Sequence, residues 1–154
     1  MGTTDALKPL TIKRAKDVFA KQGWQYDDAG EFSIRSGFAG IGLEISHIEP
    51  NVNVISTVAV DSIGQDRYEE VREWVEQYNY TKAYPTVTAL KDANRGITAL
   101  GVAYSLPGHW GYTDAQFASH VLTGIQGVVA ASRDFLAAFA PQVLQQIDAM
   151  AQQG

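Results

Sequence analysis

One helical pattern near the end of the sequence constrains the fold more than any other feature. Thr113 and Gln116 have the spacing of a capping box, in which each side chain bonds the other residue's backbone N–H at a helix start. The stripe that follows consists of Phe117, Val121, Ile125, Val128, Ser132, Phe135 and Phe139, widened by Leu122, Val129 and Leu136. It runs to about Ala140, and Pro141 then stops or kinks the helix. A stripe this long and wide predicts a helix that covers a sheet.

Before this helix, segments whose apolar residues recur with the 3.6-residue period of helices alternate with segments that have the two-residue period of strands. Helices are predicted for residues 11–22, ended by Gly23, and from Ser62, which has capping-box spacing to Gln65. Strands are predicted for residues 24–26 and 31–35 around a turn at 27–30, and for 38–46, 52–60, 86–91 and 97–106. The sequence thus predicts an α+β fold with helices packed on an antiparallel sheet of about five strands, in the order α-β-β-β-α-β-β-α.

Small residues form bare strips in this pattern. On the long helix the strip consists of His120, Gly124, Gly127, Ala131 and Ala138. On the strands, Gly40 and Gly42 form one strip, and Gly101 and Ala103 form another. Glycine inside a helix costs about 1 kcal/mol relative to alanine, so two glycines predict that another backbone comes close there. Matched bare strips on a sheet can likewise receive a helix or a partner chain.

The residue types that catalysis or metal binding needs are scarce. Cysteine is absent, which removes disulfides, thiolate nucleophiles and thiolate metal sites. The three histidines, His47, His109 and His120, have no partner histidine at helical spacing, and no serine lies in a nucleophile elbow. The glycines of residues 37–42 resemble a phosphate loop, but they alternate with apolar residues inside a predicted strand. We therefore expect no catalytic residue, no cofactor and no metal.

Charge and length restrict the partners and the organisation of the chain. The net charge of −5 has the wrong sign for a protein that wraps nucleic acid or anionic lipid. Residues 1–10 lack the apolar run of a signal peptide, and the position at which a myristoylation motif beginning with Met1-Gly2 needs Ser or Thr is Ala6. We expect a cytoplasmic protein without a membrane partner. The 154 residues fit a single domain over residues 1–154, in which 142–154 form a short amphipathic tail.

The loop of residues 107–112 has unusual contents. It places His109, Trp110 and Tyr112 among glycines, and these are residue types that binding surfaces favour. An aromatic side chain in a loop also often folds back as a lid over the core. Both interpretations, a binding rim and a core lid, remain open at the level of the sequence.

The order of elements resembles the YbjN-like family, a group of candidate bacterial sensory-transduction regulators with the fold of type III secretion chaperones. The resemblance covers roughly residues 7–141. It rests on residues 10–12 at the first helix, the strand of residues 39–46, residues 71–79 with Trp74 and Tyr78, and residues 111–116 before the long helix. It implies an α+β domain, homodimers, no established enzymatic activity and, from the chaperone relatives, binding of another polypeptide.

The leading hypothesis is a non-enzymatic, chaperone-like or regulatory module that binds protein and forms a homodimer. The candidate contact residues are Trp74, Tyr78, His109, Trp110, Tyr112, His120, Gly124 and Gly127. The competing hypothesis is a small-molecule-binding protein or enzyme with a pocket between the sheet and the long helix. A polar cluster of His109 or His120 with Asp114 or Glu44 would favour it. A third hypothesis is a subunit that only completes a larger assembly.

Overall fold

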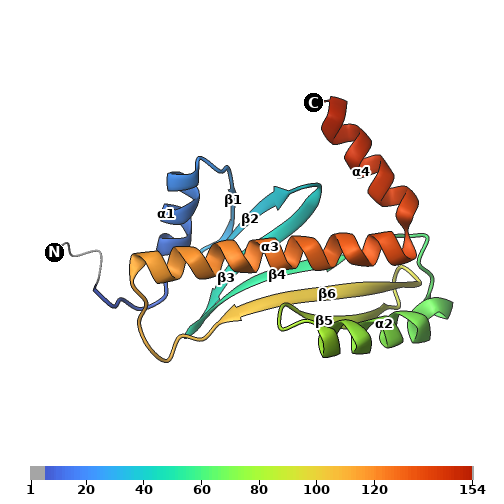
Figure 1. Cartoon of the computed structure of the whole chain (residues 1–154), viewed down its shortest axis with the longest axis horizontal. Helices are drawn as coiled ribbons and strands as arrows, with labels where there is room; N and C mark the ends of the chain where they lie inside the picture. The colour runs from blue at the N-terminus through green and yellow to red at the C-terminus, as the bar shows by residue number, and fades with distance from the viewer. Residues whose placement is uncertain (1–5, 154) are drawn as a thin grey trace.

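The computed structural model describes residues 6–153, in which helices pack on one antiparallel sheet (Figure 1). Residues 1–5, with the Met1-Gly2 motif and the start of the segment tested for a signal peptide, lie outside the described part. The helices are α1 (Ile12–Gln22), the short 3-10 helix η2 (Gln65–Arg67), α2 (Tyr68–Thr81), α3 (Asp114–Phe139) and α4 (Pro141–Gln153). The strands are β1 (Asp27–Gly30), β2 (Ser33–Phe38), β3 (Ile41–Ile48), β4 (Asn51–Val58), β5 (Thr86–Asp92) and β6 (Ile97–Leu106).

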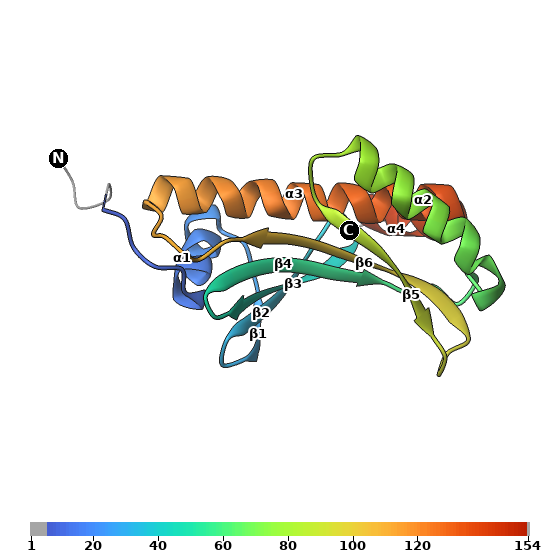
Figure 2. The same cartoon turned by 90° about the horizontal axis from the view of Figure 1, so that it is seen from below.

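The sheet confirms the predicted α+β class. Over the described residues it has six strands, in the order β1-β2-β3-β4-β6-β5, where the sequence predicted about five. Every neighbouring pair is antiparallel. Figure 2 shows α2, α3 and α4 on the same side of the sheet, whose other side is bare. The core therefore lies between the helices and one face of the sheet.

Helix α3 forms as the stripe predicts. Thr113 and Gln116 make both bonds of the capping box, which confirms the predicted start. Phe117, Val121 and Val128 are buried against the sheet, where α3 contacts β6, β4 and β3. At 1.5 Å per residue the 26 residues of α3 span about 39 Å, more than the length of the ten-residue strand β6.

The predicted strand at residues 24–26 is wrong, and so is the turn at 27–30, which is β1. Helix α1 ends at Gly23 as predicted, with a φ of 72°, and the next backbone N–H, that of Trp24, donates to Phe19 O at 2.9 Å. That N–H is therefore used at the end of α1 and is not free for pairing in a strand. Pairing with β2 begins only at Asp27, opposite Arg35, and the turn of this hairpin falls at residues 31–32.

The glycines of residues 37–42 do not form the continuous strand that the sequence predicted. Ala39 and Gly40 have φ values of 51° and 80° and make the tight turn between β2 and β3. The bare strip on the sheet therefore contains Gly37, Gly42 and Gly101 in place of Gly40. Gly37 pairs with Gly42, and Gly101 lies in the same row across β4. The segment still differs from a phosphate loop, because a strand and not a helix follows it.

The capping box predicted at Ser62 and Gln65 is also wrong. Ile63 and Gln65 join the start of β6 through backbone bonds, from Thr98 N to Ile63 O at 2.8 Å and from Gln65 N to Gly96 O at 3.2 Å. Helix α2 therefore starts later, at Tyr68, after η2. The cap residue of η2 is Gly64, which has no side chain to offer.

The C-terminal tail is a complete helix, α4, that begins directly at Pro141. Proline suits the first position of a helix, because an N–H at that position would have no acceptor within the helix and its absence costs no hydrogen bond. Arg133 of α3 holds α4 through Asp148 at 2.8 Å and also donates to Ala39 O at 2.8 Å. One guanidinium therefore joins α3, α4 and the turn between β2 and β3.

Asn79 connects α2 to the start of the edge strand β5. Its side-chain amide donates to Val87 O and accepts from Val87 N, both at 2.9 Å, and Val87 is buried. Asn79→Ala is expected to lower the free energy of unfolding by about 1–3 kcal/mol, because both backbone groups lose their partner. Urea denaturation measures this loss. Gln77→Ala, at an exposed position of the same helix, is the control, and an equal loss in both variants would contradict the assignment.

Candidate functional site

The loop of residues 107–112 acts both as a lid and as an exposed rim. Tyr112 is buried, its hydroxyl donates to Pro107 O at 2.7 Å, and its backbone pairs with Lys8. Trp110 is 59% exposed, and His109 is also exposed. Tyr112 thus closes the core, while the other two side chains remain accessible.

His120 lies on the exposed side of α3 beside two tyrosines. Its Nδ1 is 2.9 Å from the Tyr104 hydroxyl, and its ring packs edge-on against Tyr112. Burial raises the pKa of Tyr104 and of Tyr112, so both phenols stay protonated at neutral pH. Asp114 pairs instead with Lys8 and Arg14.

A small-molecule site between the sheet and α3 was expected to contain a polar cluster. No such cluster forms from His109 or His120 with Asp114 or Glu44. Glu44 pairs with Arg35, an exposed residue at the β1–β2 end of the sheet, and accepts from Ser46. Asp114 is held at the start of α3, where its hydrogen bond with Lys8 and the charge of that amine lower its pKa. The two candidate acids are therefore paired with other residues, and neither forms a cluster with His109 or His120.

The two glycines of α3 meet aromatic side chains of this chain, where the sequence predicted a backbone. A Cβ at Gly124 would lie 2.7 Å from Tyr104 Cδ1 and 3.2 Å from a methyl of Val54. A Cβ at Gly127 would lie 3.1 Å from the ring of Tyr84, which is half exposed. The small size of Gly124 is thus accounted for inside the monomer.

Trp74 and Tyr78 hold α2 against α3. Their rings stack at 4.9 Å, and Trp74 also packs edge-on against Phe135 and Phe139. Burial and the nearby carboxylate of Asp134 raise the pKa of Tyr78. Trp74 is half-buried and Tyr78 is buried, so most of their surface is already used within the chain.

An apolar groove runs along the other flank of α3, and we call it the α3 groove. It has a volume of about 480 Å³. Its lining consists of Trp24, Phe38, Leu122, Ile125, Gln126, Val129, Ala130, Arg133 and Asp134. Leu122 and Val129 are half-buried, with one side left to solvent. The groove lies between α3 and the chain that links α1 to the first hairpin.

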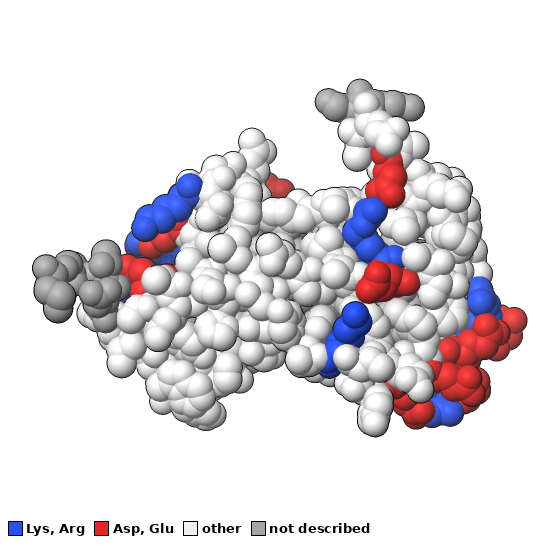
Figure 3. Space-filling model, in the orientation of Figure 1, with Lys and Arg blue, Asp and Glu red and all other residues white. Residues whose placement is uncertain are grey.

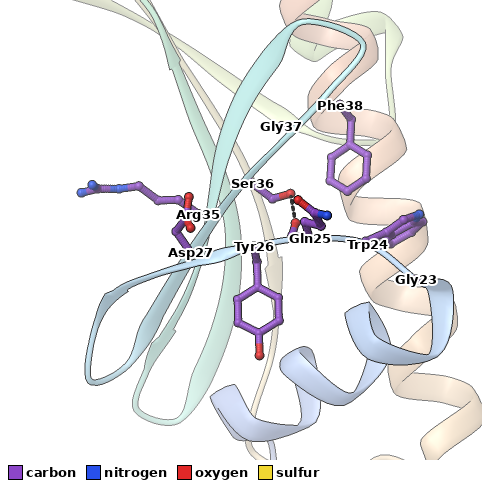
Figure 4. Close-up of a pocket in the computed structure, with 9 residues that line it drawn as sticks. All are labelled: Gly23, Trp24, Gln25, Tyr26, Asp27, Arg35, Ser36, Gly37 and Phe38. Atoms are coloured by element: carbon purple, nitrogen blue, oxygen red, sulfur yellow. Dashed lines mark hydrogen bonds between the residues drawn. The ribbon is translucent and has the colours of Figure 1, made fainter.

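The aromatic wall of the α3 groove is built from segments far apart in the sequence. Trp24 follows α1, Phe38 ends β2, and their rings meet edge-on at 4.9 Å (Figure 4). Behind them Phe19 of α1 is fully buried and packs edge-on against Trp24, Tyr26 and Phe38. Figure 4 also shows a hollow beside the groove, between residues 23–27 and 35–38, which shares Trp24 and Phe38. Phe19 therefore fixes the position of the wall.

Apart from Arg133 and Asp134 at one end, the groove lies in an uncharged part of the surface. Between Asp114 and Arg133, helix α3 contains no Lys, Arg, Asp or Glu. Figure 3 shows no charged side chain over the middle of this face, whereas acidic and basic groups gather over α2 and near the start of α4. Arg133 closes one end of the groove and is already paired with Asp148. A docked side chain would therefore meet apolar atoms and few charges.

Comparison with known proteins identifies the fold. No protein-family model and no curated protein matches the chain. Among solved structures, the chain is similar to YbjN from E. coli, described as a candidate transcription regulator. The TM-score is 0.67, with 17% sequence identity over 89% of this chain and 97% of YbjN.

The chain has the fold of YbjN. This confirms the fold that the sequence resemblance implied. At 17% identity the similarity concerns the fold, and the site must be judged from the residues of this chain.

Within this YbjN fold, the α3 groove was not predicted from the sequence. The predicted contact residues lie elsewhere on the chain, although Tyr78 and Gly127 line a second hollow on the opposite flank of α3. The uncharged run between Asp114 and Arg133 was the available signal. No comparable signal in the sequence indicated the aromatic wall, because the contact between Trp24 and Phe38 depends on where α1 and β2 end.

Two further properties of the YbjN fold in this chain bear on function. Over residues 6–153 no group of three or more His, Asp or Glu side chains is placed to hold a metal ion. Among the helices described, none combines the length and the apolar character that a bilayer span requires.

Proposed function

We propose that the chain is a non-enzymatic polypeptide-binding module and that the α3 groove is its docking site. The observation that supports this proposal is the accessible apolar lining of the groove within an uncharged surface. Contiguous apolar patches on a protein surface commonly mark interaction sites. The wall is rigid, because Phe19 is buried behind Trp24 and Phe38.

The partner best suited to this groove is an amphipathic helix. Along α3 the lining runs from Leu122 to Arg133. This flank is about 17 Å long, the length of about three helical turns. Such a helix would offer apolar residues at positions i, i+4 and i+7, the helix-in-groove mode of peptide recognition. Its contact face would be mostly apolar, because the charged residues of the lining, Arg133 and Asp134, lie together at one end of the groove.

Leu122→Glu is expected to weaken docking at least about tenfold, because a carboxylate would lie in an apolar contact. The probe is a displayed library of 15-residue helical peptides, selected on the intact chain. We expect selected peptides to have apolar residues at helical spacing, and their affinity is measured through the fluorescence of Trp24. Trp24→Phe should remove the signal.

The matched control for this experiment is Leu90→Glu, at an exposed leucine on β5 outside the groove. It should leave the affinity unchanged. Equal losses in both variants, or a library that yields no peptide, would overturn the proposal. Binding of a small apolar dye in the groove without any peptide binding would favour the small-molecule alternative.

A further inference from the structure

One residue of strand β2 leaves its backbone hydrogen-bonding groups open inside the hollow of Figure 4. Phe32 O accepts from a backbone N–H of β3, so the backbone groups of even-numbered residues in β2 are directed at β3 and those of odd-numbered residues at β1. Arg35 pairs in this way with Asp27, where the pairing of β1 begins. The next odd-numbered residue, Gly37, would face Gln25, but no backbone hydrogen bond joins the two.

The Ser36 side chain keeps the backbone groups of Gly37 open. Its hydroxyl donates to Gln25 O at 2.8 Å, so the carbonyl that would bond the N–H of Gly37 is already used (Figure 4). Gly37 is exposed, and it has no side chain that could cover its backbone. Glycine within a strand is typical of places where a ligand approaches the backbone closely. Gly37 therefore offers one donor and one acceptor, side by side, to the hollow.

The hollow around Gly37 has the size and the walls of a small-molecule site. Its volume is about 570 Å³, and ligand pockets usually measure about 300–1,000 Å³. The rings of Trp24 and Phe38 form one wall, which the buried ring of Phe19 holds in place. Aromatic walls with a few polar groups from the backbone are what such pockets commonly present.

The open edge is too short for a peptide strand. Arg35 is already paired with Asp27, and Ala39 leaves the strand with a φ of 51°. Only the donor and acceptor of a single residue are therefore available, whereas the addition of a strand needs a row of them. A compact ligand with one complementary edge fits this arrangement.

The charges around the hollow restrict the ligand further. Asp27 lines it, and Arg35, its one lining cation, is paired with Glu44. No lining residue thus offers an unpaired cation to a phosphate or a carboxylate. We expect an uncharged ligand.

We propose that this hollow binds an uncharged planar heteroaromatic compound that has a hydrogen-bond acceptor beside a donor on one edge, as adenine does. Adenine has such an edge, because its amino group lies next to a ring nitrogen that accepts. The acceptor would take the N–H of Gly37 and the donor would bond its C=O, while the ring packs on Trp24 and Phe38. The inference goes beyond the proposed function, since the hollow and the α3 groove share only those two aromatic residues.

The first test uses the intact chain and two probes, 9-methyladenine and 9-methylpurine, which differ only in the amino group. In a titration followed by ¹H–¹⁵N NMR, 9-methyladenine should shift the amide resonance of Gly37. It should not shift that of Gly101, which pairs with a strand on either side. 9-Methylpurine should bind about fivefold or more weakly, because it leaves the C=O of Gly37 without a donor.

Gly37→Pro is the second test, because it removes the open N–H and no hydrogen bond of the sheet. It should weaken the binding of 9-methyladenine about fivefold or more. Lys91→Pro on the opposite edge strand, β5, is the matched control. Val87 N donates away from the sheet to Asn79, so the N–H of Lys91, four residues further on, also faces outward. This variant should bind the probe as the natural chain does.

The outcomes separate this inference from the proposed function. No binding of 9-methyladenine at millimolar concentration, equal affinity for the two probes, or an unshifted Gly37 amide overturns the inference. Undiminished binding in Gly37→Pro does the same, and if that variant fails to fold, the comparison of the two probes on the natural chain still decides. The peptide experiment with Leu122→Glu does not depend on any of these results, so either proposal can fail alone.

Discussion

Gly124→Leu is expected to destabilise the fold by about 1–3 kcal/mol or more, because it overpacks the contact between α3 and the sheet. Even the first carbon of the new side chain would lie 2.7 Å from the Tyr104 ring. That ring cannot easily move, since it packs edge-on against Tyr84 and its hydroxyl contacts His120. Urea denaturation should show a lower transition midpoint. A loss of partner binding in this variant would then follow from unfolding.

Gly127→Ala is the matched control and should change stability in the opposite direction. A Cβ there would meet the half-exposed Tyr84 ring at 3.1 Å, and that ring has room to shift. Alanine in a helix gains about 1 kcal/mol over glycine, so a small stabilisation is expected. If Gly124→Leu proved as stable as the natural chain, the close packing of Tyr104 on α3 would be contradicted.

Phe19→Ala should have the largest effect of any single substitution considered, about 3–5 kcal/mol of lost stability. The side chain is fully buried and has ring centroids 5.4 Å from Trp24, 5.8 Å from Tyr26 and 6.1 Å from Phe38. Removing it leaves a cavity and frees the wall of the α3 groove. Thermal unfolding measures the first effect. Weaker peptide binding at temperatures where the variant is folded measures the second.

Phe32→Ala provides the comparison for this prediction. Phe32 lies in the turn between β1 and β2 and is 54% exposed, so its removal should cost less than about 1 kcal/mol. Similar losses for both phenylalanines would mean that Phe19 does not organise the wall. A destabilised Phe19→Ala variant that still binds peptide at full affinity would separate stability from docking.

The parts of the fold that follow from the sequence are those that local residues determine. The stripe of α3 and its cap at Thr113 depend on residues three or four positions apart, and both were predicted. The left-handed Gly23 at the end of α1 was predicted for the same reason. Such features need no knowledge of distant segments.

The errors arose where distant backbone groups compete for hydrogen bonds. Residues 63–65 bond the start of β6, so the helix predicted at Ser62 cannot begin there. Trp24 gives its N–H to the end of α1, so the strand predicted at residues 24–26 does not form. In both cases the local pattern allowed the prediction, and a partner far along the chain overrode it.

The candidate site was the least predictable part. Gly124 and Trp74 were chosen for their residue type, yet the structure shows packing partners for both within the chain. The α3 groove depends instead on Trp24 and Phe38 meeting beside α3, which requires the exact ends of α1 and β2. Only the uncharged run on α3 was visible in the sequence.

The one-sided covering of the sheet also affects how the sequence can drift over evolutionary time. On β3 and β4, Ile45 and Val54 face the helices and are fully buried, whereas Gly42 and Thr57 face the bare side and are exposed. Substitutions at the bare positions need only preserve the strand, so relatives should diverge there first. Tolerance to change would then alternate residue by residue along each central strand, and close relatives of this chain could differ most on the face that no helix covers.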